Sequence, residues 1–158
     1  MQKNLLKTSE TIIKVGLIGC GRISENHIKA ILSFPKDCKL VAICDIRSKN
    51  LELTKNNLLN LNKQKNLKDQ SLPQSFNEYQ DLLDAVKNKS INIDLLIFCT
   101  PSGMHAEQVI SASKLSLHSC SEKPMATRWE DGLRMVNACQ EAKVHLFIVK
   151  QNRFNKTL

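Results

Sequence analysis

Residues 12–24 read IIKVGLIGCGRIS, and this stretch decides the fold. The apolar, β-branched run that ends at Ile18 predicts a buried strand. The two glycines that follow it predict a tight turn, because glycine adopts backbone conformations that other residues avoid. A helix is expected over Ser24–Phe34, where apolar residues recur at helical spacing and Pro35 closes the segment. Strand, turn and helix therefore follow one another directly.

The rest of the chain repeats this alternation of strand and helix. Short apolar runs predict four more strands, over residues 39–44, 93–99, 117–120 and 144–149. Apolar residues at helical spacing predict helices around residues 51–59, 79–86, 109–112 and 127–142. The polar stretch from Leu61 to Ser75 is expected to be a frayed helix end and a loop.

The last of these helices is expected to begin with a capping box formed by Thr127 and Glu130, which stand three residues apart. The apolar stripe of this helix is expected to consist of Leu133, Val136 and Ala138.

Each predicted strand is too hydrophobic to face water on either side. The sequence therefore predicts an α/β fold with a doubly wound parallel sheet, covered by helices on both faces.

Length and composition indicate one soluble domain, since the chain has 158 residues, 42% of them hydrophobic. The apolar stretch Thr11–Cys20 contains Lys14 and is far shorter than a membrane span, and residues 1–10 do not resemble a secretory signal. Six cysteines without a C-x-x-C pair indicate buried free thiols, with no disulfide scaffold or metal site. We expect a cytoplasmic protein that has no membrane partner.

The net charge of +8 raises the question of nucleic-acid binding. Much of the basic excess lies in residues 49–68, where lysines alternate with Asn, Gln and Leu. Aromatic and arginine side chains that could stack on bases are missing from this segment. A solvated helix face explains the pattern better than a nucleic-acid patch does, and we expect no nucleic-acid partner.

The glycine turn Gly19-Cys20-Gly21-Arg22-Ile23-Ser24 is a candidate dinucleotide site, because it follows a strand and opens a helix whose N–H groups can meet a pyrophosphate. Asp45 ends the next strand, 21 residues beyond Ser24, and can accept hydrogen bonds from ribose hydroxyls. The alternative is a plain turn and a solvated aspartate. A carboxylate at this position favours NAD, while Arg47 keeps NADP open.

Three further groups of polar residues follow predicted strands. Thr100, Pro101 and His105 come after the strand over 93–99, where Thr100 and His105 could touch the cofactor; the alternative for His105 is a capping or packing role. Glu122 and Lys123 precede a proline after the next strand, where a lysine could stabilise an alkoxide, although such a pair is usually a surface turn. Residues 150–155, which include Gln151, follow the last strand and could hold the nicotinamide amide or form a terminal loop.

Taken together, the segments VGLIGCGRISENH, ICD, IFCTPSGMH, EKP and KQNRFN closely resemble the Gfo/Idh/MocA family of oxidoreductases over residues 13–155. The resemblance implies a Rossmann domain that binds NAD or NADP. It implies that Lys123 is the catalytic lysine, that Gly19, Gly21 and Asp45 belong to the cofactor site, and that Thr100, His105 and Glu122 lie near the ribose and nicotinamide. It also implies a cis bond before Pro124.

The segments EKPMATRWEDG and HLFIVKQNRFN look like those of family members that oxidise the 3-hydroxyl of UDP-N-acetylglucosamine-type sugars for surface polysaccharide biosynthesis. Family members continue into a second, substrate-binding domain, whereas this chain stops at Leu158. We therefore expect an N-terminal extension over 1–10 and one Rossmann domain over 11–158, without the substrate domain.

Two functions remain open at this stage. The first is the NAD(P)-binding domain of an oxidoreductase that transfers hydride between a sugar or nucleotide-sugar hydroxyl and nicotinamide, with a separately encoded C-terminal domain as its partner. The second is a non-catalytic NAD-binding module from a truncated or split gene. Whether the chain alone is an enzyme does not follow from its sequence.

Overall fold

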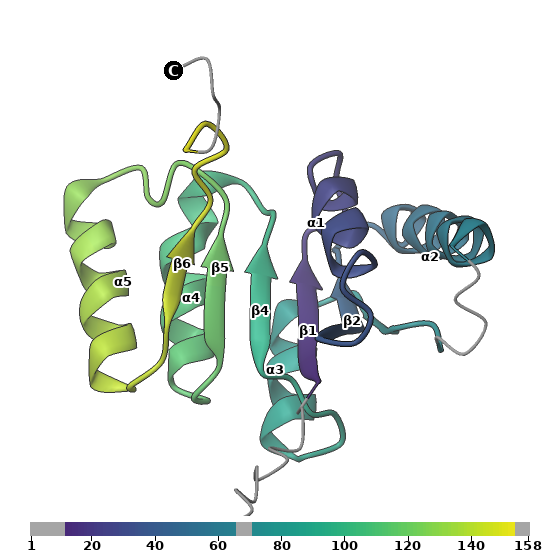
Figure 1. Cartoon of the computed structure of the whole chain (residues 1–158). Coiled ribbons are helices and arrows are strands. Elements are labelled where there is room, and N and C mark those ends of the chain that lie inside the picture. Colours follow the sequence, from purple (N-terminus) through teal and green to yellow (C-terminus); the bar gives the residue numbers. More distant parts are fainter. Residues whose placement is uncertain (1–11, 66–70, 154–158) are drawn as a thin grey trace, which may run out of the picture.

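The computed structural model describes residues 12–65 and 71–153. These form a six-stranded, wholly parallel sheet with the strand order β3-β2-β1-β4-β5-β6 (Figure 1). The strands are β1 (Ile13–Ile18), β2 (Cys38–Cys44), β3 (Gln74–Phe76), β4 (Leu95–Phe98), β5 (His118–Ser121) and β6 (Leu146–Ile148). The doubly wound parallel sheet predicted from the sequence is confirmed, and the strand order reverses between β1 and β4.

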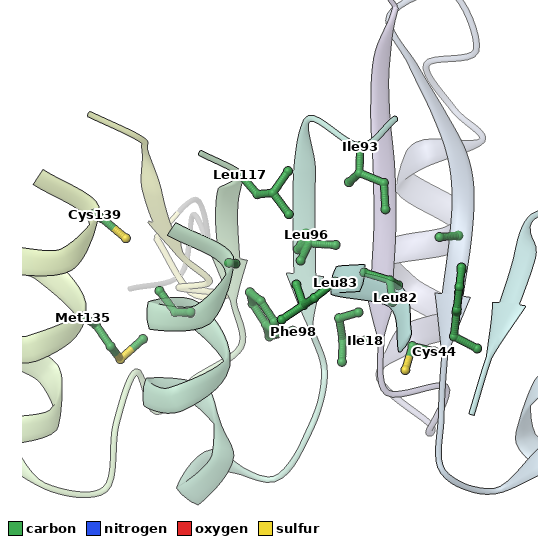
Figure 2. Close-up of a cluster of buried hydrophobic side chains, with 14 of the residues drawn as sticks. Ile18, Cys44, Leu82, Leu83, Ile93, Leu96, Phe98, Leu117, Met135 and Cys139 are labelled. Atoms are coloured by element: carbon green, nitrogen blue, oxygen red, sulfur yellow. The ribbon is translucent and has the colours of Figure 1, made fainter. Parts of the chain in front are cut away.

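Five α-helices cover the two faces of the sheet. They are α1 (Ser24–Ile31), α2 (Ser48–Gln64), α3 (Tyr79–Lys87), α4 (His105–Ser113) and α5 (Trp129–Glu141), with a short 3₁₀ turn η1 (Ser102–Met104) before α4. Two buried clusters separate the layers, one packed under α1 and α2 and one under α3, α4 and α5. The second cluster centres on Leu82, Leu96, Phe98 and Met135, all fully buried (Figure 2).

Two expectations are wrong in the first half of the chain, the end of α1 and the absence of a strand near Ser75. Helix α1 ends at Ile31, and Phe34 is 59% exposed in the turn that follows. Helix α2 ends at Gln64, within the stretch where the sequence analysis expects a helix end. The stretch expected to be a loop also contains most of β3, which is an edge strand of three residues with only Phe76 buried. A strand this short and polar carries no recognisable alternation.

Two expectations about α5 are also wrong. The helix begins at Trp129, and its N-cap is Arg128 in an extended conformation without a side-chain cap, so Thr127 and Glu130 form no capping box. Met135 and Cys139 form its buried face, whereas Leu133 and Val136 are exposed. Sequence periodicity located the helix correctly and chose the wrong face.

The sixth strand departs from the expectation that every strand is buried on both sides. Phe147 in β6, which is an edge strand among the described residues, is 53% exposed. The predicted extension over 1–10 and the end of the 150–155 segment lie outside the described residues. Within the described part of the chain, no helix has the length and apolar character required to cross a membrane.

Candidate functional site

The turn after β1 requires glycine at its first position. Gly19 has a φ of +90°, a conformation that L side chains rarely adopt. A Cβ atom there would lie 2.8 Å from the carbonyl carbon of Cys99, at the end of β4. The Gly19 N–H donates to the carbonyl of Cys44 at 2.8 Å. The turn is therefore packed against the ends of both neighbouring strands, at the point where the strand order reverses.

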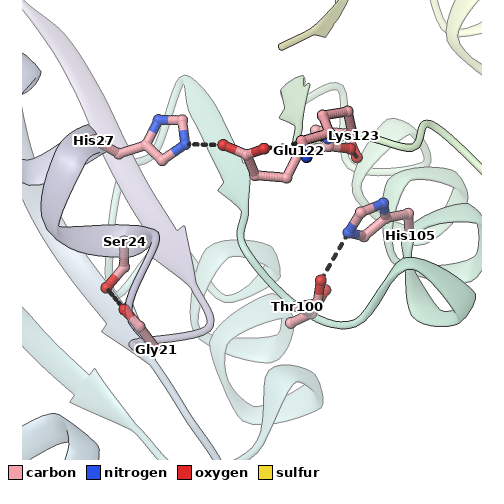
Figure 3. A network of polar contacts seen from close by, with 8 residues as sticks. Gly21, Ser24, His27, Thr100, His105, Glu122 and Lys123 are labelled. Carbon is pink, nitrogen blue, oxygen red and sulfur yellow. Dashed lines mark hydrogen bonds and ion pairs between the residues drawn. The ribbon is translucent and has the colours of Figure 1, made fainter. Parts of the chain in front are cut away.

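The second glycine faces open space. A Cβ atom at Gly21 would meet no atom within 4 Å. In the described part of the chain, the backbone N–H groups of Gly21, Arg22 and Ile23 donate no hydrogen bond. Ser24, buried at the start of α1, donates its hydroxyl to the Gly21 carbonyl and so ties the turn to the helix (Figure 3). Unpaired N–H groups at a helix start, with free room beside them, fit a pyrophosphate.

Asp45 braces the glycine turn from the end of β2. Its Oδ2 accepts a hydrogen bond from the Cys20 N–H at 2.8 Å and one from the Asn50 amide at 3.1 Å. Its Oδ1 accepts from the Arg47 N–H at 2.8 Å. A carboxylate oxygen has room for two acceptor contacts, so Oδ1 retains one for a ribose hydroxyl.

A cleft of about 410 Å³ runs from the glycine turn toward the start of α3. Its far wall is tied together by hydrogen bonds. Tyr79 donates its hydroxyl to the Gln108 carbonyl at 2.8 Å, and Thr100 donates to Gln108 Oε1 at 2.6 Å. The cleft is lined by Ile18, Gly19, Gly21, Cys44, Asp45, Ile46, Arg47, Asn50, Glu78, Tyr79, Cys99, Thr100, Pro101, Met104 and Gln108. It lies at the carboxyl ends of the strands where the strand order reverses, which is the place expected of a nucleotide site in a doubly wound sheet.

The thiols around the cleft are kept neutral by burial. Desolvation raises the pKa of Cys20 to about 11, and the nearby Asp45 carboxylate adds to the shift. Desolvation likewise raises the pKa of Cys44 to about 12 and that of Cys120 to about 11. Because the thiolate is the reactive form, these cysteines are poor nucleophiles at neutral pH.

The segment after β5 carries Lys123 and is held from the side of α1. Glu122 is 7% exposed, and its Oε1 lies 2.8 Å from Nε2 of His27 (Figure 3). The second oxygen, Oε2, accepts from the Lys123 backbone N–H at 3.2 Å. The Lys123–Pro124 bond is cis, as the family resemblance implies. Lys123 itself is exposed and does not line the cleft.

His105 holds the same segment from the other side. It is fully buried at the start of α4 and does not line the cleft. Its Nε2 lies 2.9 Å from the Thr100 carbonyl, and its Nδ1 lies 3.1 Å from the Pro124 carbonyl. These contacts fit the capping or packing role that the sequence analysis gave as the alternative for His105.

Five predicted site residues line the cleft: Gly19, Gly21, Asp45, Thr100 and Pro101. Six do not. Glu122 and His105 are buried beside it, and Lys123, Arg22, Ile23 and Gln151 are exposed outside its lining. Sequence reasoning missed Tyr79 and Gln108, which sit within helical patterns, and His27, which lies inside the quoted VGLIGCGRISENH segment. The described residues contain no group of three His, Cys, Asp or Glu that could hold a metal ion.

Known proteins share this arrangement. The family described as "Oxidoreductase family, NAD-binding Rossmann fold" (GFO_IDH_MocA) matches residues 13–150. The chain therefore belongs to the Gfo/Idh/MocA oxidoreductase family and carries its NAD-binding Rossmann domain.

Two solved structures are similar in sequence as well as in fold. One is the WlbA dehydrogenase from Bordetella pertussis in complex with NADH and UDP-GlcNAcA, at 43% identity and a TM-score of 0.79 over 94% of this chain. The WlbA dehydrogenase from Chromobacterium violaceum, solved with the same two ligands, is 38% identical with a TM-score of 0.78 over 93% of this chain. This chain covers 40% and 37% of those two chains.

Among curated relatives, the myo-inositol 2-dehydrogenase of Thermotoga maritima is 27% identical over 144 residues, which is 91% of this chain and 38% of the relative. The chain thus spans about two fifths of the length of its relatives.

Proposed function

We propose that this domain binds NAD along the carboxyl edge of the sheet and serves an oxidoreductase that removes hydride from a sugar or nucleotide-sugar hydroxyl. The observation that carries the proposal is the glycine turn, in which Gly19 allows the close approach to β4 and Gly21 leaves room beside unpaired N–H groups. The pyrophosphate would lie on residues 21–23, and a ribose hydroxyl would donate to Asp45. NADP is the alternative cofactor, because Arg47 lines the same cleft.

A substitution at Gly21 separates cofactor binding from folding. Because an added methyl group meets nothing within 4 Å, Gly21→Ala should leave the free energy of unfolding within about 0.5 kcal/mol of the wild type. The same methyl group would stand where the pyrophosphate approaches, so NAD affinity should fall by about tenfold or more. Titration calorimetry and urea unfolding would measure the two effects.

Gly103→Ala is the matched control, because a Cβ atom there also meets nothing within 4 Å and Gly103 does not line the cleft. Gly103→Ala should change neither the free energy of unfolding nor the NAD affinity. Equal NAD affinity in the wild type and Gly21→Ala would overturn the assignment of the pyrophosphate to this turn.

Lys123 is the residue we propose to act on the substrate. NAD supplies the acceptor for the hydride when it is bound. The Lys123 amine is exposed, and it would take the proton of the sugar hydroxyl as the carbon gives up its hydride. Its support in this chain is the backbone, fixed by Glu122 and the buried His105.

The substrate we propose is a nucleotide sugar such as a UDP-linked uronic acid, in the cytoplasm. The support is the 43% identity with a WlbA dehydrogenase crystallised with UDP-GlcNAcA. A second domain, encoded separately or with this one, would supply the remaining substrate contacts. Turnover with UDP-GlcNAcA and NAD after addition of that domain would support this reading. NAD binding without turnover under the same conditions would favour the alternative, a non-catalytic NAD-binding module.

A further inference from the structure

The carboxylate of Glu122 links two segments that lie far apart in the sequence. His27 belongs to α1, the helix opened by the glycine turn, and Glu122 stands 95 residues later, directly before Lys123. The side chains of His27 and Glu122 are only 15% and 10% exposed. A carboxylate in such surroundings needs hydrogen-bond partners, because an unpaired buried charge is costly. His27 supplies one of the two partners present.

The Lys123 side chain is not the other partner. Glu122 Oε2 accepts a hydrogen bond from the backbone N–H of Lys123, at 3.2 Å. Among the described residues, no ion pair joins the Lys123 ammonium to Glu122 or to another carboxylate. Two donors therefore occupy the carboxylate, and the amine of the neighbouring lysine stays exposed and uncommitted.

We propose that His27 is a positioning residue, which occupies the Glu122 carboxylate and thereby keeps the Lys123 amine free for the substrate. The proposal deepens the proposed function of Lys123 and rests on it. Without the imidazole, Glu122 would keep a partly buried oxygen without a donor, and the nearest flexible cation in the chain sequence is Lys123 itself. An ion pair between them would draw the amine away from the substrate side and hold it protonated.

The other groups near Glu122 do not replace His27. The charge of Glu122 helps to raise the pKa of Cys99, and the pKa of Cys120 to about 11, although desolvation is the larger cause in both. Both thiols therefore stay neutral and provide no compensating charge. His105 is also unavailable, because its ring nitrogens face the carbonyls of Thr100 and Pro124.

The test measures how readily the Lys123 amine reacts in the intact chain without NAD. Trace acetylation at pH 8, followed by mass spectrometry, gives the rate at Lys123 relative to Lys87 and Lys143 in the same molecule. His27→Leu should slow the relative rate at Lys123 at least threefold, because only the free neutral amine reacts. His27→Gln retains an amide donor that can reach Glu122 and should restore the rate to within twofold of the wild type.

Two further variants keep the test decisive. His27→Asn carries an amide too short to reach the carboxylate; it should slow Lys123 as the leucine variant does and serves in its place if that variant does not fold. In a Glu122→Gln background no carboxylate can capture the amine, so adding His27→Leu or His27→Asn should leave the acetylation rate at Lys123 unaltered. His145→Gln, at an exposed histidine near the opposite end of the sheet, is the matched control and should behave as the wild type.

An unchanged or faster rate at Lys123 in both His27→Leu and His27→Asn would overturn the proposal, as would slowing that persists equally in the Glu122→Gln background. Parallel NAD titration separates this result from the proposed function. Absence of NAD binding in the wild type would refute the cofactor site, while the acetylation rates, measured without NAD, would still decide the role of His27.

Discussion

The nucleotide side, around the glycine turn and Asp45, and the lysine side, around Lys123, differ in how firmly contacts within the described residues hold their polar side chains. On the nucleotide side, residues from β1, β2 and the glycine turn line the cleft. The Asp45 carboxylate there accepts three hydrogen bonds from within the chain. On the lysine side, Lys123 is exposed, and within the described residues its side chain makes no hydrogen bond or ion pair. This difference predicts that cofactor binding can be changed without changing the proposed role of Lys123, and the predictions below test that separation.

The largest effect on folding and on NAD binding is expected at Gly19. Gly19→Ala places a methyl group 2.8 Å from the Cys99 carbonyl carbon, at a positive φ, so the free energy of unfolding should fall by about 2 kcal/mol or more. NAD affinity should fall by about 100-fold as the turn distorts. Urea unfolding and calorimetric titration would measure both.

Gly132→Ala is the matched change on the lysine side, in the interior of α5, where a Cβ atom would make only an ordinary contact with Ala126 at 4.0 Å. It should raise the stability by about 0.5–1 kcal/mol and leave NAD affinity alone. If both glycine variants weakened NAD binding equally, the two regions would not be independent.

A smaller effect is expected at Asp45. Asp45→Ala removes the acceptor for the Cys20 and Arg47 N–H groups and the proposed acceptor for the ribose, so NAD affinity should fall about tenfold. Discrimination against NADP should relax, because the carboxylate no longer repels a 2′-phosphate. Calorimetric titration with NAD and with NADP would measure both affinities. An unaltered ratio of the two affinities would remove Asp45 from the cofactor site.

Alkaline pH should destabilise the nucleotide side through its buried thiols. Burial raises the pKa of Cys20 to about 11 and of Cys44 to about 12, from an ordinary value of 9.0. As the pH rises above 9, the unfolded chain releases these protons first, so the free energy of unfolding should fall, by up to about 1.4 kcal/mol per pH unit for each thiol. Urea unfolding between pH 7 and 10.5 would measure the slope, and Cys44→Ala should flatten it.

The smallest effect is expected from Lys123→Ala on cofactor binding. Because Lys123 is exposed and outside the cleft, NAD affinity should stay within about twofold of the wild type. Under the proposed function, turnover of UDP-GlcNAcA with NAD in the presence of a substrate domain should fall about 10²–10⁴-fold, the range of general acid–base catalysis. A calorimetric titration beside a steady-state assay would test both, and a full rate without the lysine would remove it from the mechanism.

The fold was predictable because its defining signals are local. The apolar run before Gly19, the two glycines and Asp45 at the end of the next strand lie within about 35 residues, and each keeps its predicted place. The short edge strand β3 was missed because only Phe76 in it is buried. The face of α5 was missed because Leu133 and Val136 are as apolar as Met135, and only the packing of α4 against α5 selects between them.

The site was predictable only in part, because tertiary contacts decide which polar groups meet. The glycine turn and Thr100 could be placed from strand ends, whereas the pairing of His27 with Glu122 crosses 95 residues and leaves no mark in local spacing. His105 illustrates the same limit, since its position after Thr100 suggested contact with the cofactor, whereas its ring is buried against the carbonyls of Thr100 and Pro124.

The hydrogen bonds of Asp45 have a consequence for the energetics of ligand capture. Its carboxylate already joins the backbone at Cys20 to the backbone at Arg47, so both loops that border the cleft are pinned together in the free protein. Little conformational entropy remains to be lost there when a nucleotide arrives, and more of the gross interaction energy appears as affinity.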